Sequence, residues 1–232
     1  ILKDIKESGA LLATQHISHT YPHCWRCKNP VIFRATEQWF CSVNDFKKEA
    51  LEAIKNVRWI PGWGQARIES MVGDRADWCI SRQRKWGVPI PIFYCEDCGE
   101  PIINAETIER IAKAFEEEGS IAWCNKTPEQ LIGDLAVCPK CGCKHLKAEQ
   151  DIMDVWFDSG SSYAYVLDHF KDHSFPADVY LEGNDQYRGW FQSSLLTSVA
   201  TRGVAPYKTV ITHGMVVDGE GKKMSKSLGN GV

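Results

Sequence analysis

The stretch from residue 177 to residue 213 constrains the fold most, because strand-like and helix-like sequence alternate along it. "ADVYLEG" and "KTVITHGMVVD" are short apolar runs rich in β-branched residues, and "RGWFQSSLLTSVATRG" between them is long enough for a helix. Strands that alternate with helices in this way form βαβ units with parallel strands. We therefore expect an α/β fold with a parallel sheet and ligand sites at the carboxyl ends of its strands.

Polar residues follow both predicted strands at those carboxyl ends. They are Glu182, Gly183, Asn184, Asp185 and Gln186 after the first strand, and His213, Gly214 and Met215 after the second. Acidic and amide groups can hold ribose hydroxyls or an amine, and a histidine beside a glycine can approach a phosphate, so the two clusters predict one crevice. The alternative is that Asn184 or Asp185 caps the next helix, but capping would explain neither Gln186 nor the second cluster.

Three C-x-x-C pairs occur among the ten cysteines. Two of these pairs, each followed by glycine, offer the four sulfurs of a tetrahedral zinc site, and they are Cys95, Cys98, Cys138 and Cys141. Cys143 is an alternative to Cys141, and "AETIERIAKAFEEEGS" predicts a helix between the two pairs. We expect a closed structural zinc site here, the alternative being reduced cysteines without a metal.

The third pair, Cys24 and Cys27, has no second pair left in this chain. A zinc site needs four ligands, so these two supply half of one. The pair uses Cys143 or His23 in an irregular site, or its partners lie in sequence that is absent here. The spacing favours the second interpretation.

Four regions follow from a pass along the chain. They are a small β-containing connective module with half a zinc site over residues 1–44, a helical segment that connects to the sheet region over 45–94, a zinc-ribbon-like insertion over 95–150 and the parallel-sheet region with the lysine-rich end over 151–232. A net charge of −3 gives no overall basic footprint, so any nucleic-acid contact must come from local patches. There is no run of eighteen apolar residues, and we expect a soluble chain that does not enter a membrane.

The last residues, "GEGKKMSKSLGN", are rich in glycine and lysine. Lys222, Lys223 and Lys226 lie among small and hydroxyl side chains, which is typical of a mobile loop that neutralises polyphosphate. The alternative is a solvated turn, since two lysines with two serines also occur by chance.

Several motifs in this order resemble the class I aminoacyl-tRNA synthetases, and among them the isoleucyl-tRNA synthetase family. They are "YPHCWRCKNPVIFRATEQWF", "WCISRQRKWGVPIP", "DVWFDSGSS", "YLEGNDQYRGWFQSSLL" and "KMSKS". Valyl and leucyl enzymes share "KMSKS", but "EGNDQYRGWF" is not expected before it in either, and a valyl-type enzyme is the alternative within the class. The resemblance implies activation of L-isoleucine with ATP and transfer of the acyl group to the terminal adenosine of tRNA(Ile).

The resemblance also implies roles for individual residues. Lys223 and Lys226 would stabilise charge on the departing pyrophosphate, in a motif loop that also holds Met224, Ser225 and Ser227. The residues expected at the aminoacyl-adenylate and ATP are Glu182, Gly183, Asp185, Gln186, His213, Gly214 and Met215, with Trp156 and Trp190 as walls of the isoleucine slot. On their residue type alone the two tryptophans could equally be core aromatics. The implied cofactors are structural zinc and magnesium with ATP, in a monomeric, cytoplasmic parent protein.

The family's "HIGH" motif, its editing domain and its anticodon-binding helices are not found in these residues. The resemblance therefore implies the second half of a Rossmann-type nucleotide-binding catalytic domain, and we expect no aminoacylation or pyrophosphate exchange from this segment alone. An alternative of a different class is a zinc-containing nucleic-acid-binding module in which Arg82, Arg84 and Lys85 contact phosphate. Such a module would have no use for Asp185.

Overall fold

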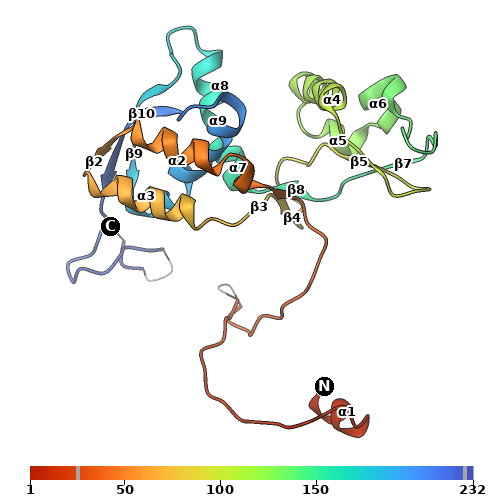
Figure 1. Ribbon diagram of the computed structural model, residues 1–232, viewed down its shortest axis with the longest axis horizontal. Coiled ribbons are helices and arrows are strands. Elements are labelled where there is room, and N and C mark those ends of the chain that lie inside the picture. The colour runs from red at the N-terminus through yellow and green to blue at the C-terminus, as the bar shows by residue number, and fades with distance from the viewer. Residues whose placement is uncertain (25–26, 227–228, 232) are drawn as a thin grey trace. The chain divides into compact units, whose positions relative to one another are not determined.

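The structure is a computed structural model, and it describes residues 1–24, 27–226 and 229–231. It divides into two compact units, Ile1–Glu37 and Gln38–Val232 (Figure 1). Each unit is held together by contacts within itself.

The first unit begins with helix α1, Leu2–Glu7, which has no buried residue. Beyond it, the described residues up to Glu37 form no strand, only an isolated bridge between His23 and Pro30. Within the expected β-containing module of residues 1–44, the described residues form a strand only at Phe40–Cys41. Ile17, Ile32 and Phe33 are 71%, 81% and 80% exposed, and β propensity without a packed partner does not order a strand.

A parallel sheet forms the centre of the second unit. Strand β9, Ala177–Gly183, leads through helix α9, Trp190–Arg202, into strand β10, Tyr207–His213, and β10 pairs in parallel with β9. The predicted βαβ unit with a parallel sheet is thus confirmed. On its other side β10 pairs in parallel with β2, Arg58–Ile60, a short strand that the sequence analysis missed.

One face of this sheet carries the core. Val210 is in register with Trp59 on one side and Tyr180 on the other, and all three are buried. Helices α2, Lys47–Lys55, and α3, Trp63–Gly73, contribute to the same core as α9 (Figure 1). The apolar faces of these two helices complete the core of the parallel sheet, so both helices pack with the strands of residues 177–213.

Short antiparallel pairs connect this core to the rest of the unit. Strand β1, Phe40–Cys41, pairs with β3, Trp78–Cys79, and β4, Ser81–Arg82, pairs with β8, Ile152–Met153. The chain then forms helices α7, Val155–Gly160, and α8, Ser162–His169. Gly160 lets α7 cross α9 closely, since a Cβ there would lie 2.8 Å from the backbone of Ser193.

Residues 93–148, which we call the cysteine module, have a hydrophobic cluster of their own. Strand β5, Phe93–Cys95, pairs antiparallel with β6, Pro101–Ile102, and with β7, Leu146–Ala148. The helices of the module are α4, Ala105–Glu118, α5, Ala122–Asn125, and α6, Pro128–Ile132. Asn104 and Thr107 form a capping box that starts α4, the helix that the sequence places between the cysteine pairs.

Candidate functional site

The two polar clusters at the strand ends meet in the structure. The register of the parallel sheet pairs His213 with Gly183. A Cβ on Gly183 would lie 2.8 Å from Oδ1 of Asp185, 3.6 Å from Cε of Met215 and 3.7 Å from Cε1 of His213. Three side chains from both clusters therefore surround one backbone position, and a larger residue at 183 would displace the carboxylate of Asp185.

A 3-10 turn, Asn184–Tyr187, holds the first cluster. Tyr187 is fully buried, and its hydroxyl shares a hydrogen bond of 2.9 Å with Oγ1 of Thr212 in β10. Gly64 in α3 makes space for this hydroxyl, since a Cβ there would lie 2.1 Å from it. The turn is thereby anchored in the core while Asp185 stays exposed, and neither anchor was identified from the sequence.

Gln186 contributes to helix capping, which corrects one step of the sequence analysis. Its Oε1 accepts a hydrogen bond of 2.9 Å from the backbone amide of Trp190, the first residue of α9. An amide oxygen at this position satisfies one of the amides that the first turn of a helix leaves unpaired. Capping therefore does explain Gln186, but it does not explain why Asp185 and His213 converge on Gly183.

The two tryptophans expected at the amino-acid slot differ in their surroundings. Trp190 stacks on Tyr180 with ring centroids 3.9 Å apart, and its indole N–H donates to the carbonyl of Ser159 at 3.0 Å. Trp156 is 42% exposed, and its ring lies over Gly189, where a Cβ would come within 2.7 Å of it. Trp190 is thus anchored like a core aromatic, whereas Trp156 keeps a surface that a ligand can reach.

Asp154 ties the start of α7 to the connecting strands. Its carboxylate is nearly buried and accepts from the indole N–H of Trp78 at 3.0 Å, while Arg82 lies 2.9 Å away. The second carboxylate oxygen accepts from the backbone amide of Trp156 at 3.3 Å, which caps α7. Asp154 therefore fixes the helix that presents Trp156, a role that the sequence analysis did not assign.

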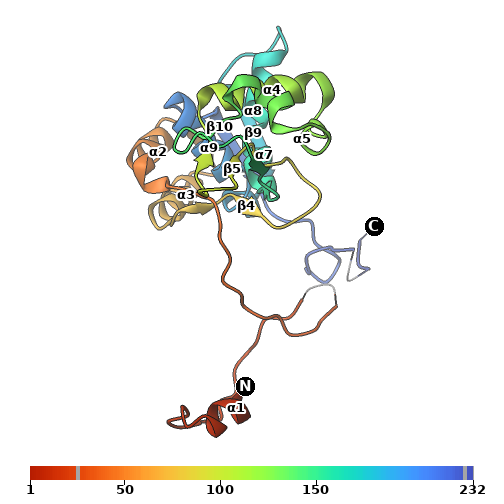
Figure 2. The same cartoon turned by 90° about the vertical axis from the view of Figure 1, so that its right-hand side faces the viewer.

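The lysine-rich segment follows β10 and leaves the sheet as a looped stretch (Figure 2). Val217 and Lys223 form an antiparallel bridge, and the amide of Asp218 donates to the carbonyl of Lys222 at 2.8 Å. Lys223 and Lys226 are exposed, and neither forms an ion pair with any residue that the structure describes. Ser227 lies outside the described residues.

Asp218 and Asn230 hold the two ends of this segment together. Nδ2 of Asn230 donates to Oδ2 of Asp218 at 2.6 Å, and the amide of Lys222 donates to Oδ1 at 2.9 Å. These two contacts keep the pKa of the Asp218 carboxyl below its ordinary value, because both stabilise its charged form. Neither residue was singled out from the sequence, although an acidic residue before a glycine-rich turn is a signal for such a turn.

The four predicted zinc ligands lie together in the cysteine module. Sγ of Cys95 lies 3.5 Å from that of Cys141, Sγ of Cys98 lies 3.6 Å from that of Cys138, and all four sulfurs lie within 4.8 Å of one another. Zinc–sulfur bonds of about 2.3 Å in a tetrahedron place sulfurs roughly 3.8 Å apart. The donor set and its spacing therefore fit a tetrahedral zinc ion.

Hydrogen bonds within this cluster shift the pKa values of its thiols in opposite directions. The backbone amide of Cys98 donates to the sulfur of Cys95 and, together with other hydrogen bonds, lowers its pKa to about 6. For Cys141 the amide of Cys143 also favours the thiolate, but hydrogen bonds to the neighbouring thiols, that of Cys95 first, raise its pKa to about 12. Four thiols this close do not all ionise without a cation between them.

A backbone turn of one kind recurs at each C-x-x-C pair. The amides of Lys28, Gly99 and Gly142 donate to the carbonyls of Cys24, Cys95 and Cys138 at 2.8, 2.9 and 2.9 Å, and these three residues have φ values of +62°, +71° and +75°. Cys24 and Lys28 therefore share this hydrogen bond and this positive φ with the two pairs of the cysteine module. Cys24 and Cys27 do not join a group of three or more potential metal ligands among the described residues, whereas Cys143 lies with Asp97 and His145 beside the four-cysteine cluster.

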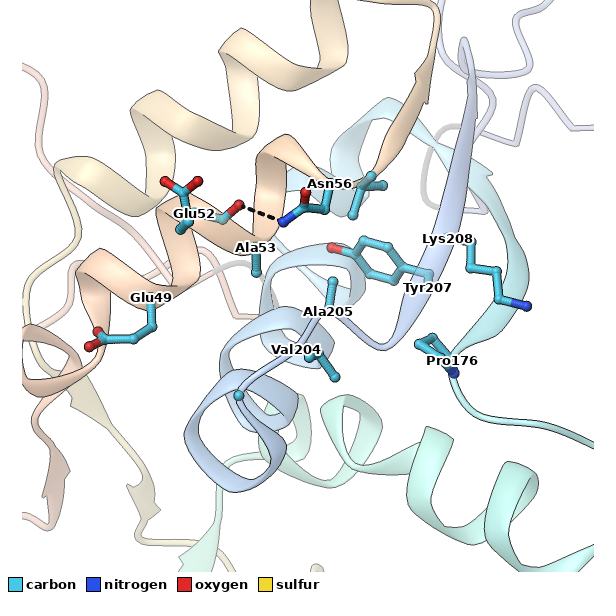
Figure 3. A pocket seen from close by; sticks show the side chains of 11 residues that line it. Glu49, Glu52, Ala53, Asn56, Pro176, Val204, Ala205, Tyr207 and Lys208 are labelled. Atoms are coloured by element: carbon cyan, nitrogen blue, oxygen red, sulfur yellow. Dashed lines mark hydrogen bonds between the residues drawn. The ribbon is translucent and has the colours of Figure 1, made fainter.

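A cavity of about 350 Å³ lies at the opposite end of β10 from His213. Figure 3 shows it between α2, with Glu49 and Glu52, and the start of β10, with Tyr207 and Lys208. A strand of this length spans about 20 Å, so the cavity is far from the strand-end clusters. It is not the site that the sequence predicts.

The chain is similar in sequence to proteins of known function. Residues 3–232 match the family of class I tRNA synthetases (I, L, M and V). The chain is 64% identical to an isoleucine–tRNA ligase of Caldicellulosiruptor saccharolyticus over 230 residues, which is 99% of this chain and 25% of that protein. It is 62% identical to an isoleucine–tRNA ligase of Thermoanaerobacter sp. over 232 residues, which is 100% of this chain and 25% of that protein.

The chain thus spans about a quarter of the length of the curated relatives it matches. A solved structure, the crystal structure of the ternary complex of Agrobacterium radiobacter K84 agnB2 LeuRS-tRNA-LeuAMS, is 29% identical, with a TM-score of 0.44 over 67% of this chain and 22% of that one. No helix in the described part of the chain combines the length and the apolar character that crossing a bilayer requires.

Proposed function

Since this chain belongs to the class I tRNA synthetases for isoleucine, leucine, methionine and valine, we propose that it forms part of the active site of an isoleucine–tRNA ligase. The reaction would join L-isoleucine to ATP, release pyrophosphate and then pass the isoleucyl group to the 3′ end of tRNA(Ile). Identities of 64% and 62% to isoleucine–tRNA ligases favour isoleucine over the other amino acids of the family. A valyl-type enzyme is the alternative within the family.

The observation that carries this proposal is the convergence of Asp185, His213 and Met215 around Gly183 at the carboxyl ends of β9 and β10. Ligands of open parallel sheets bind at this edge, and the exposed carboxylate of Asp185 offers an acceptor for an amine or a ribose hydroxyl. Glu182 and Gln186 flank it, although Gln186 also caps α9. His213 and Gly214 would lie beside the adenosine.

The lysine-rich segment "GEGKKMSKSLGN", which we call the lysine loop, would act on the polyphosphate. Lys223 and Lys226 have exposed side chains and lie ten and thirteen residues beyond His213, the last residue of β10. Charge that grows on the departing pyrophosphate is stabilised by cations held in position beforehand, and a glycine-flanked loop can close over ATP and reopen. Magnesium would accompany ATP and share this neutralisation. Trp156, with its exposed ring, would form one wall of the slot for the apolar side chain of isoleucine. Trp190, in α9, would form the other wall.

Zinc would have a structural role in the cysteine module. Cys95, Cys98, Cys138 and Cys141 fill all four positions of a tetrahedral ion, which leaves no open position for a substrate. Two of these sulfurs are buried in the cluster that joins β5 to the helices of the module. The module would hold its shape through the metal and take no part in bond making.

The test is isoleucine-dependent exchange of labelled pyrophosphate into ATP, measured in a full-length protein that carries this chain. Lys223→Ala should lower kcat about 100-fold, because it removes a cation that acts on the transition state. Lys208→Ala is the matched control, since Lys208 lies at the amino end of β10 and pairs with Asp178, and it should leave the rate unchanged. Equal effects of both variants would contradict the assignment.

The second arm tests the strand-end cluster and the amino acid. Asp185→Ala should abolish exchange, and valine should replace isoleucine only poorly in the unaltered protein. If Asp185→Ala spares exchange, the polar cluster is not an adenylate site and a nucleic-acid-binding module becomes the better interpretation. If valine is the preferred substrate, the protein is the valyl-type enzyme.

A further inference from the structure

The backbone around Lys223 is fixed by two side chains that the function proposed above does not use. Asp218 accepts three hydrogen bonds, from the amides of Glu220 and Lys222 at 3.0 and 2.9 Å and from Nδ2 of Asn230 at 2.6 Å. The contact with Asn230 is partly buried, whereas the two contacts with backbone amides are exposed to water. They close a turn immediately before the lysines.

Asn230 completes the arrangement from the other side of the lysines. Its Oδ1 accepts from the amide of Ser225 at 2.9 Å, and its Nδ2 also donates to the carbonyl of Lys223 at 3.3 Å. The side chain of Asn230 therefore reaches the backbone both at Lys223 and two residues beyond it. Together with Asp218 it fixes the chain on both sides of Lys223.

The antiparallel contacts between residues 216–217 and 223–224 also restrain the backbone. The amide of Met224 donates to the carbonyl of Val216 at 3.1 Å, and Gly221 has a φ of +78°, which allows the tight turn. The side chain of Lys223 remains exposed. The backbone is thus held while the ammonium group can meet a ligand.

We propose that Asp218 and Asn230 are positioning residues that hold the backbone of the lysine loop, so that Lys223 meets the triphosphate of ATP in its reactive arrangement. The inference rests on the function proposed above. A cation stabilises a transition state most when it is positioned before the reaction. The hydrogen bonds of Asp218 and Asn230 to the backbone on both sides of Lys223 would provide this positioning.

The hydrogen bonds of Asp218 and Asn230 can be tested by swapping the two side chains. In the double variant Asp218→Asn, Asn230→Asp, the new amide can still accept from the amides of Glu220 and Lys222 and donate to residue 230. The new carboxylate can still accept from the amide of Ser225, but the weaker donation from residue 230 to the carbonyl of Lys223 is lost. In Asn230→Asp alone, two carboxylates face each other, so the contact between residues 218 and 230 becomes repulsive.

Two readouts are measured in the full-length protein that carries this chain: hydrogen exchange of the amides of Lys222 and Ser225, and pyrophosphate exchange. Asn230→Asp should accelerate amide exchange about tenfold and lower kcat about tenfold, with an unchanged KM for isoleucine. The double variant should recover both to within about threefold of the unaltered protein. Glu220→Gln, which removes only the exposed ion pair with Lys222, should change neither.

The inference is overturned if the unaltered protein is active and Asn230→Asp leaves kcat unchanged, or if the double variant is as impaired as the single one. Faster amide exchange with unaltered kcat would make the pair a purely structural contact. An unaltered protein that shows no pyrophosphate exchange would instead refute the function proposed above, so the two failures are distinguishable.

Discussion

At the scale of single residues, the sequence identifies polar side chains but not the partners that hold them. The positions of Asp185, His213 and Met215 after two strands are enough to predict that they converge. Tyr187 and Gly64 anchor the turn that carries Asp185, yet they are 123 residues apart in the sequence and meet only because α3 packs beside that turn. Such contacts have no local signal, because they depend on how elements pack.

Gly189 illustrates a position where packing decides the residue. A Cβ there would lie 2.5 Å from Oε1 of Gln186 and 2.7 Å from the ring of Trp156. We expect Gly189→Ala to lower the free energy of unfolding by about 1–3 kcal/mol, because the ring or the capping amide must move. Denaturant titration of the purified protein measures this.

Gly73 at the end of α3 provides the matched control, since a Cβ there meets nothing within 4 Å. Gly73→Ala should change the free energy of unfolding by no more than about 0.5 kcal/mol. If both variants have the same free energy of unfolding, Trp156 and Gln186 do not restrict the residue at position 189.

At the scale of elements, long periodic segments are predictable and short strands are not. The helix Ala105–Glu118 and the pair of strands around α9 follow from their apolar spacing. Strand β2 has three residues and is recognisable only through its pairing with β10. The strand-like residues before Glu37 show the converse, since the described ones have β propensity but pair only in the bridge between His23 and Pro30.

Metal removal should affect one group of elements and spare another. The buried clusters of the parallel sheet and of the cysteine module share no residue. A chelator should therefore accelerate hydrogen exchange across residues 93–148 and leave the amides of Tyr180 and Val210 protected. Hydrogen exchange with mass spectrometry measures both regions in one sample.

Metal analysis of this 232-residue chain by itself should give one zinc per chain, because Cys24 and Cys27 supply only two ligands. Cys138→Ser should lose it, whereas Cys41→Ser, a half-buried thiol outside the module, should retain it. Two zinc ions per chain would mean that Cys24 and Cys27 bind metal within this chain. An absence of zinc would contradict the structural site.

At the scale of the whole molecule, the two units differ in what orders them. All residues of both buried clusters lie between Val43 and Val210, and α1 has no buried residue. Deletion of residues 1–37 should therefore leave the thermal unfolding midpoint of the protein unchanged within about 2 °C. Thermal unfolding followed by circular dichroism measures the midpoint.

A longer deletion serves as the control for that experiment. Removal of residues 1–60 also removes the whole of α2, with buried Ile54, and β2, with buried Trp59, and should abolish cooperative unfolding. If the shorter deletion already lowers the midpoint by more than about 5 °C, residues 1–37 stabilise the folded core, contrary to this expectation.

The sequence by itself determined the parallel βαβ unit, the polar residues at its strand ends, the cysteine pairs and the lysine loop. These features depend on spacing along the chain, which sets strand and helix periodicity and the geometry of a local turn. Only the tertiary structure decided that α2, α3 and β2 complete the sheet core, that Gln186 caps α9 while Asp185 stays exposed, and that Asp218 and Asn230 hold the lysine loop. Each of these depends on side chains brought together from separate segments, and their contacts are set by packing and by the pairing of polar groups, which no local pattern encodes.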